Sequence, residues 1–178
     1  MESTNQDITG NTTDETQFSM GVVKNDQGEI MDSSEMSLVQ LIKKAEIFPI
    51  EFIVRNIATG SLTKRLGIPE GTVLDRPLLE YCFKKDELND PLISKEHIYS
   101  FGWATEKEIK IIDQTTLRIN DLLVGLFRGI GIKLVDFKIE YGKAWNKENE
   151  EKEIVLADEI SPDTCRLWDS KTEKKLDK

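Results

Sequence analysis

The feature that most constrains this sequence is an apolar strand that runs directly into a cluster of charges near the C-terminus. Residues 154–157 are four consecutive apolar residues, which predict a short buried strand. Asp158 and Glu159 follow immediately, and Asp163 and Arg166 come after a Ser-Pro break. Buried charges are costly unless they are paired, so this cluster is a poor core. It suits the rim of a pocket for a metal ion and a charged ligand.

A second strand, predicted at residues 132–142, supplies further charges. Polar and apolar side chains alternate along it, and alternate residues of a strand point to opposite faces. The polar face carries Asp136, Lys138 and Glu140, and the apolar face carries Phe137, Ile139 and Tyr141. A polar, acidic turn at residues 143–153 then leads back to the strand at 154–157.

This hairpin allows Glu140 and Asp158 to share one Mg²⁺, which would explain why the two carboxylates tolerate each other. Lys138 stands between Asp136 and Glu140 in the sequence and is placed to contact a phosphate. The alternative is a surface strand with a ladder of charges at i and i+2.

A candidate anion site precedes this hairpin in the chain. Residues 47–54 are β-rich and largely apolar, so they predict a strand covered on both faces, with Arg55 at its end. Ser61 is predicted as the N-cap of a short helix, and Gly67 as the residue just after it. Free N–H groups at the helix start and the Arg55 guanidinium would form a cradle for a phosphate or carboxylate. An ordinary capped helix with a surface arginine is the equally weighted alternative.

The remaining predicted elements form a scaffold. Residues 78–84 predict a strand, and Ser94 opens a short helix that carries His97. Thr105 and Glu108 form a capping box. It opens the longest predicted helix, 105–128. The residues of its core-facing side recur at spacings of three and four: Ile109, Ile112, Thr116, Ile119, Leu123 and Leu126.

Charge and composition exclude several classes of protein. The net charge is −9, and residues 1–35, with eight acidic residues and Lys24, carry −7 of it. The near-neutral remainder lacks the basic face of a nucleic-acid binder. No apolar run is long enough to span a membrane and no secretory signal is visible. We therefore expect a cytoplasmic protein with no nucleic-acid or membrane partner.

The uneven distribution of charge suggests two parts, an acidic and flexible leader at 1–35 and one domain at 36–178. A small hairpin at Phe18–Met31 is possible, and a phosphate loop at Gly21–Lys24 is a weak alternative.

Cysteine and histidine, the usual ligands of zinc and other transition metals, are scarce. Cys82 and Cys165 lack a CxxC spacing, and we expect them to be free, buried thiols. His97 is the only histidine, so it cannot form a cluster. Metal chemistry in this chain would have to use carboxylates and a hard ion such as magnesium.

Four blocks of the sequence closely resemble the SAICAR synthetase family of purine biosynthesis. They are FPIEFIVRNIATGSLTKRLG at 48–67, KKDELNDP at 84–91, LVDFKIEYG at 134–142 and LADEISPDTCRLWD at 156–169. Their order and spacing match the family over about residues 36–178. The resemblance implies an α+β fold, with a mostly antiparallel sheet and flanking helices. It also implies an ATP-dependent ligation, in which the carboxylate of CAIR is joined to L-aspartate to give SAICAR, ADP and phosphate.

The resemblance also implies roles for particular residues. Arg55 and Ser61 correspond to the cradle for the ribotide substrate, and Asp163 and Arg166 would face the ribotide and aspartate. Lys138 corresponds to a contact of the nucleotide phosphates. Within this set the catalytic roles fall to Lys138, Asp163 and Arg166.

The nucleotide side is implied in the same way. Glu140 and Asp158 correspond to ligands of the magnesium–nucleotide complex, so ATP and Mg²⁺ are the expected cofactors. The segment 44–47, with Lys44 and Glu46, matches the hinge that holds adenine, mainly through backbone groups.

The chain also departs from the family pattern. Family members begin with a lobe whose glycine- and lysine-bearing loop covers the ATP phosphates, whereas residues 1–35 contain no matching GK-x-K stretch. The family also continues past Asp177 with further helices. We expect such a loss to weaken ATP binding.

Three readings follow from this comparison. The first is a shortened enzyme, active alone or as a homo-oligomer that completes the site. The second is a non-catalytic relative that binds a purine-pathway ribotide or nucleotide, or a partner protein. The third and weakest is a decaying gene fragment that folds poorly.

Overall fold

The computed structural model describes residues 44–148 and 150–176, and those from Ala45 onward belong to the compact unit Ala45–Lys178. The predicted leader at 1–35, its hairpin and its candidate phosphate loop all lie outside the described residues. No helix within the described part of the chain is long and apolar enough to cross a membrane.

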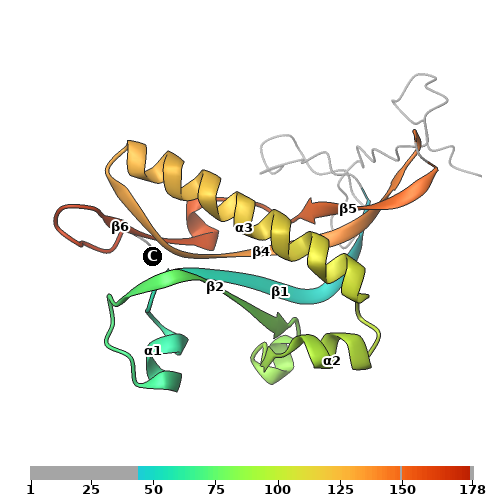
Figure 1. The fold of residues 1–178 in the computed structure, drawn as a ribbon, viewed down its shortest axis with the longest axis horizontal. Helices are drawn as coiled ribbons and strands as arrows, with labels where there is room; N and C mark the ends of the chain where they lie inside the picture. Colours follow the sequence, from blue (N-terminus) through green and yellow to red (C-terminus); the bar gives the residue numbers. More distant parts are fainter. Residues whose placement is uncertain (1–43, 149, 177–178) are drawn as a thin grey trace, which may run out of the picture. The chain divides into compact units, whose positions relative to one another are not determined.

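One antiparallel sheet organises this unit (Figure 1). In chain order the elements are β1 (Glu46–Ile57), α1 (Ser61–Leu66), β2 (Val73–Phe83), β3 (Leu92–Ile93), α2 (Lys95–Ser100), α3 (Glu106–Gly129), β4 (Ile132–Asn146), β5 (Glu151–Ala157) and β6 (Cys165–Asp169), with single 3₁₀ turns η1 (Asp86–Leu88) and η2 (Pro162–Thr164). The strand order is β3-β2-β1-β4-β5, and β6 also pairs with β4. All of the strand pairs are antiparallel. The predicted α+β class, with flanking helices, is confirmed.

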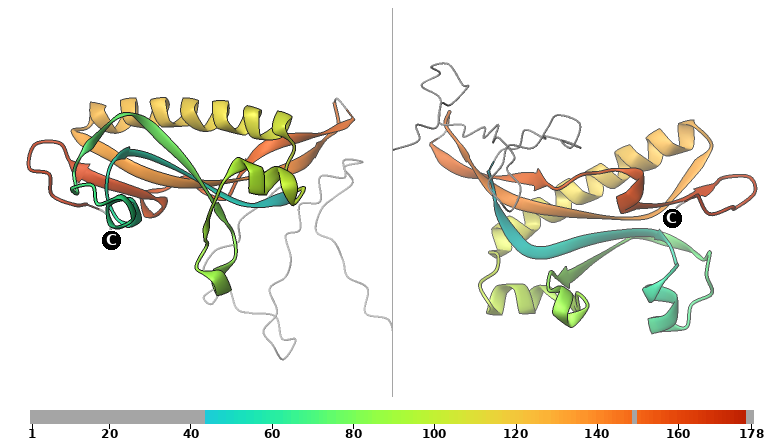
Figure 2. Two further views of the ribbon diagram at one scale, coloured as in Figure 1. Left: turned by 60° about the horizontal axis from the view of Figure 1, so that its bottom comes forward. Right: turned by 180° about the vertical axis from the view of Figure 1, so that it is seen from behind.

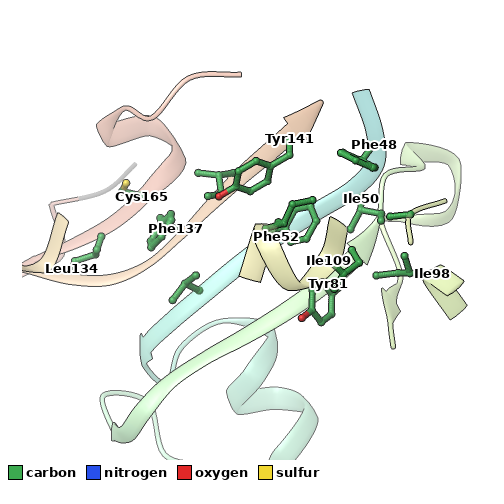
Figure 3. Close-up of a cluster of buried hydrophobic side chains, with 14 of the residues drawn as sticks. Phe48, Ile50, Phe52, Tyr81, Ile98, Ile109, Leu134, Phe137, Tyr141 and Cys165 are labelled. Carbon is green, nitrogen blue, oxygen red and sulfur yellow. The ribbon is translucent and has the colours of Figure 1, made fainter. Parts of the chain in front are cut away.

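The helix α3 covers one face of the sheet, and α1 lies on the other side (Figure 2). The core between the sheet and α3 consists of alternate residues of β1 and β4, together with Tyr81, Ile98 and the first turns of α3 (Figure 3). Its centre is Phe52, which meets the rings of Tyr81 and Tyr141 edge-on, at centroid distances of 5.7 and 5.3 Å. The predicted apolar face of β4 is therefore the core face.

A bulge in β4 separates the core from a second, smaller cluster. The register between β4 and β6 shifts between Leu134 and Asp136. Leu134 stays in the main core, whereas Val135 packs with Ile57 and Trp168 on the opposite side. Because an extra residue at a bulge changes which face the chain presents, Asp136 is directed away from α3, toward the polar face.

The long helix forms as predicted, with one difference. Thr105 is its N-cap and Glu108 completes the capping box. Leu126 was expected in the core but is 59% exposed. A seven-residue spacing drifts by about 20° per heptad on a straight helix. Leu126, two heptads after Ile112, has therefore drifted to the edge of the buried face.

The β4–β5 hairpin is longer and more exposed than the sequence suggested. The strand predicted to be buried at 154–157 is only partly buried, and Leu156 is 41% exposed, because β5 lies at the edge of the sheet. Residues 143–153 were expected to form a turn, but β4 extends to Asn146 and β5 begins at Glu151. The ends of both strands carry polar side chains, which are also typical of turns. In the structure these side chains bond between the strands, as in the 2.8 Å hydrogen bond from Asn146 to Glu153.

Replacing Thr105 with alanine is expected to lower the free energy of unfolding by about 1 kcal/mol. The Thr105 hydroxyl accepts a hydrogen bond from the Glu108 backbone N–H at 3.2 Å, and this bond satisfies one of the free donors at the helix start. Urea unfolding would measure the loss. Thr115→Ala is the matched control. Its exposed hydroxyl only bonds back to the Ile111 carbonyl, so no loss is expected there, and equal losses would contradict the capping role.

Two of the three tyrosines are expected to make stability depend on alkaline pH. Burial and the bond to Asp113 raise the pKa of Tyr81, and burial raises the pKa of Tyr141. Unfolded tyrosine loses its proton near pH 10, before these folded residues do. The free energy of unfolding should therefore fall as pH rises above about 10. Unfolding measured across this range tests the effect, and Tyr81→Phe should show a shallower decline.

Candidate functional site

A cavity of about 430 Å³ lies on the polar side of the sheet, next to the last part of β1, the start of β6 and residues 136–138 within β4. Five of the predicted site residues line it: Arg55, Lys138, Asp158, Asp163 and Arg166. They come from three strands and from the connection between β5 and β6, so the fold brings together groups that are more than one hundred residues apart in the chain. The predicted charged rim at 158–166 is therefore one wall of this cavity.

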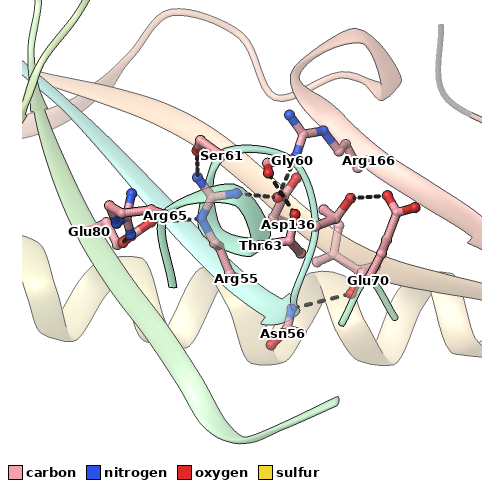
Figure 4. A network of polar contacts seen from close by, with 12 residues as sticks. Arg55, Asn56, Gly60, Ser61, Thr63, Arg65, Glu70, Glu80, Asp136 and Arg166 are labelled. Carbon is pink, nitrogen blue, oxygen red and sulfur yellow. Dashed lines mark hydrogen bonds and ion pairs between the residues drawn. The ribbon is translucent and has the colours of Figure 1, made fainter. Parts of the chain in front are cut away.

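Arg55 is the centre of the polar network (Figure 4). It is 4% exposed and stands at the end of β1, beside Asp136 of β4. Its Nε donates to Glu80 at 2.7 Å, Nη1 to Asp136 at 2.9 Å and Nη2 to the Ser61 hydroxyl at 3.0 Å. The structure places Arg55 against the start of α1 and buries it, so it is not the surface arginine of the alternative reading. However, Ser61 is the first helical residue and not the N-cap, which is Gly60. The Ser61 hydroxyl accepts from the arginine and caps no backbone N–H.

Arg166 joins the same network from β6. Its Nη1 donates to the Asp136 oxygen that Arg55 also contacts, at 3.1 Å. Its side chain is 42% exposed, so part of the guanidinium remains open to the cavity. One buried carboxylate therefore holds two arginines side by side, an arrangement that suits a doubly charged anion such as a phosphate.

Gly60 permits this close packing. Its φ of +57° lies in the left-handed region, and a Cβ there would stand 2.6 Å from Arg166 Nη1. Only glycine meets both the backbone and the space requirement.

A Gly60→Ala variant is expected to lose about 1–3 kcal/mol of its free energy of unfolding and to displace the Arg166 guanidinium. Denaturant unfolding measures the first effect. Gly67→Ala is the control, because Gly67 also has a positive φ but open space around its Cβ position. That variant should show the smaller backbone cost alone, and equal losses would show that contact with Arg166 is unimportant.

Lys138 stands on the cavity wall with a fixed partner. Its Nζ donates to Glu51 at 2.6 Å. Burial alone would lower the pKa of Lys138, but the hydrogen bond and charge of Glu51, with the charge of Glu140, raise it overall. Lys138 is therefore a permanent cation at neutral pH.

Asp158 reaches the cavity through an unusual backbone conformation. Glu140 pairs in register with Ala157, so strict alternation would send Asp158 to the face opposite Glu140. Asp158 has a φ of +64° and lines the cavity beside Lys138. An aspartate tolerates this left-handed conformation better than most residues. The backbone bends here between β5 and β6, which both run antiparallel to β4.

Magnesium ligation by Glu140 and Asp158 fits the donor chemistry. The two residues lie at the same end of the β4–β5 ladder. Glu140 is buried and forms an ion pair with Lys84. In the described part of the chain, no three His, Cys, Asp or Glu side chains gather as a ready-made metal site. Mg²⁺ commonly takes one or two carboxylates and completes its shell with water and ligand phosphates, so these two would hold the ion together with a phosphate ligand.

The two predicted hinge residues lie elsewhere. Lys44 precedes β1 and Glu46 begins it, about 30 Å along the strand from Arg55 at the strand's rise per residue. Glu46 accepts from Lys152 at 2.6 Å. Beside this end of β1 is a second hollow of about 530 Å³, lined by residues 47–49 and 84–87. Lys84 lines this hollow and also forms an ion pair with Glu140.

Three buried or paired charges were missed by the sequence analysis. Glu51 holds Lys138, Glu80 holds Arg55, and Lys84 was taken for part of a solvated loop. A carboxylate within an otherwise apolar strand was the available signal for Glu51 and Glu80. The predicted free thiols, Cys82 and Cys165, are buried and unpaired by disulfides, and burial raises the pKa of both.

Comparison with known proteins assigns this architecture to a family. The sequence profile of the family described as SAICAR synthetase matches residues 5–178. The phosphoribosylaminoimidazole-succinocarboxamide synthase of Pelagibacter ubique is 66% identical over 139 residues, which are 78% of this chain and 53% of that protein. The chain thus spans about half the length of this relative.

Solved structures agree. The crystal structure of phosphoribosylaminoimidazole-succinocarboxamide synthase from Ehrlichia chaffeensis superposes with a TM-score of 0.73 at 51% identity, covering 78% of this chain and 57% of that one. A SAICAR synthetase in complex with ADP gives 0.70 at 48% identity, covering 76% and 56%. On the strength of a profile that matches almost all of its length and of relatives this similar, the chain belongs to the SAICAR synthetase family.

Proposed function

We propose that this chain carries the ribotide- and magnesium-binding part of a SAICAR synthetase active site and takes part in joining L-aspartate to the carboxylate of CAIR, with ATP consumed, in purine biosynthesis. The observation that carries the proposal is the convergence of Arg55, Lys138 and Arg166 on one cavity that also contains Asp158 and Asp163. Family membership and the names of the relatives support the same reaction.

The ribotide phosphate is best placed at the two arginines. Arg55 and Arg166 share Asp136, and both line the cavity. Their charges exceed that of the shared carboxylate, and guanidinium groups bind phosphate oxygens in a bidentate manner. Asp163, at the η2 turn on the same wall, would then face the amine of aspartate or the ribotide ring.

Lys138, Glu140 and Asp158 form the nucleotide side of the proposed site. ATP would supply the phosphoryl group that activates the substrate carboxylate, and Mg²⁺ would be held by Glu140 and Asp158. Lys138 keeps its charge and offsets negative charge that develops on the transferred group. The hollow beside residues 47–49 is where the base of a nucleotide would lie, with Lys44 and Glu46 next to it. The ADP complex of a relative supports nucleotide binding.

The test is an assay of the purified chain for amide formation from CAIR, L-aspartate and ATP. Turnover should require all three substrates and Mg²⁺, and Lys138→Met should lose at least about a hundredfold in rate. Lys133→Met is the matched control, because Lys133 pairs with the exposed Glu173 on the surface. Turnover that survives in Lys138→Met would contradict the assigned role.

A second candidate is a binding protein without catalysis. Such a protein would use the same cavity, with Arg55 and Arg166 as the contacts of the anion. Ribotide or nucleotide binding in calorimetry without any turnover would favour it. Turnover that appears only at concentrations where sedimentation shows an oligomer would instead indicate that a second copy completes the site.

A further inference from the structure

Glu80 is a buried carboxylate that contacts Arg55, a residue of the proposed phosphate site, without lining the cavity itself. It lies on β2 and is 7% exposed. One of its oxygens accepts from Arg55 Nε at 2.7 Å, and the other forms an ion pair with Arg65 of α1. Glu80 does not line the 430 Å³ cavity, whereas Arg55 does. Apart from the long-range effect of its charge, Glu80 can therefore influence a ligand there only through its contact with Arg55.

The donors of Arg55 show what Glu80 contributes. A guanidinium group has five N–H donors in one rigid plane. Contacts with described residues use the Nε donor on Glu80, one Nη1 donor on Asp136 and one Nη2 donor on Ser61. One N–H therefore remains on each Nη nitrogen, and the side chain borders the cavity. The bond at Nε fixes the plane, and with it the direction of both remaining donors.

We infer that Glu80 is a positioning residue, which holds the Arg55 guanidinium so that its two remaining Nη donors meet a phosphate of the ligand. This inference rests on the proposed function, in which the ribotide phosphate occupies this cavity. Arg65 contacts the second oxygen of Glu80, which leaves the first oxygen to Arg55 alone.

Positioning and simple charge balance predict opposite results for Glu80→Gln. Loss of a negative charge near the cavity would, by Coulomb attraction alone, tighten the binding of an anion. The amide, however, offers one oxygen where two arginines each need an acceptor, and its NH₂ group would face an arginine donor. If Glu80 orients Arg55, binding weakens although the site has become more positive.

Glu70 supplies a matched control. It accepts from Lys175 and Thr59, each at 2.8 Å, and has no contact with Arg55. The bonds from Lys175 and Thr59, with the charge of Arg166, lower the pKa of Glu70, so it is ionised and close enough to Arg166 to affect the site electrostatically. Glu70→Gln removes the same charge from the neighbourhood without touching Arg55.

The experiment is calorimetric titration of the full chain with ribose 5-phosphate. We expect Glu80→Gln to raise Kd by about tenfold or more, as for loss of a charge-assisted hydrogen bond, and Glu70→Gln to leave Kd unchanged or lower it. Unchanged or tighter binding by Glu80→Gln would overturn the inference and leave the proposed function standing. Absence of binding by the unaltered chain would overturn the proposed function, and the inference with it.

A second measurement does not depend on the Glu80 variant folding. In ¹H–¹⁵N spectra of the unaltered chain, the Arg55 Nε–H should exchange slowly with water, because it is buried and bonded. Arg65→Met, which leaves the bond between Glu80 and Arg55 in place, should retain this signal and bind ribose 5-phosphate within about threefold of the unaltered chain. An Arg55 Nε–H that exchanges as fast as those of exposed arginines would overturn the inference directly.

Discussion

An Arg55→Met variant is expected to have a free energy of unfolding about 3 kcal/mol lower than that of the unaltered chain, and to lose the binding of ribose 5-phosphate. Arg55 is buried and bonds two buried carboxylates, Glu80 and Asp136. Removing one partner of a buried ion pair typically costs about 3–5 kcal/mol, because a charge is left uncompensated. Here Glu80 keeps Arg65 and Asp136 keeps Arg166, so the cost should lie at the lower end of that range.

Urea unfolding at neutral pH measures the loss, and calorimetry measures the binding. Arg65→Met is the control for stability, because Arg65 shares Glu80 but its side chain is 35% exposed. A more exposed ion pair of this kind contributes at most about 1 kcal/mol. If both variants lost the same free energy, the burial of Arg55 would not be what makes its contacts important.

A Phe52→Ala variant is expected to lose about 3–5 kcal/mol of unfolding free energy. Phe52 is fully buried at the middle of β1 and makes edge-on contacts with Tyr81 and Tyr141. Alanine removes the ring from water-excluded contacts and leaves a cavity between two neighbouring strands and α3. The two neighbouring strands are held in place by the hydrogen bonds of the sheet, so they cannot move in to fill the cavity.

The control for this prediction makes the same chemical change at the surface. Phe101 follows α2, is 65% exposed and stacks on Trp103 at 5.0 Å. Phe101→Ala should cost no more than about 1 kcal/mol, measured in the same denaturant series. Comparable losses in the two variants would show that the core around Phe52 is not the main source of stability.

Local patterns in the sequence predicted the main elements well. The capping box at Thr105 located the start of α3, and alternation in β4 separated Phe137 and Ile139 from Lys138 correctly. These features follow from nearby residues, since helix and strand periodicities are properties of the local backbone. Element ends were less predictable, as in β5, because polar residues occur in both exposed strands and turns.

Some residues of the candidate site were predictable from the sequence, and others were not. Arg55, Lys138 and Arg166 were recognisable from residue type and from the resemblance to a family, and the structure places all three at one cavity. Their partners were not recognisable. Glu51 and Glu80 find Lys138 and Arg55 through the registers of β1 with β4 and of β2 with β1, and register between distant strands cannot be read from local sequence.

The charged rim at 158–166 shows both kinds of information. The sequence alone determined that an apolar strand ends in charges unsuited to a core, and therefore that a pocket rim belongs there. Only the tertiary structure decided which way those charges face. Asp158 turns into the cavity through a left-handed backbone conformation, and Arg166 comes beside Arg55 because both lie against Asp136 at the β4 bulge. Residue chemistry is local, whereas the meeting of charges depends on strand register and on a bulge, which long-range packing sets.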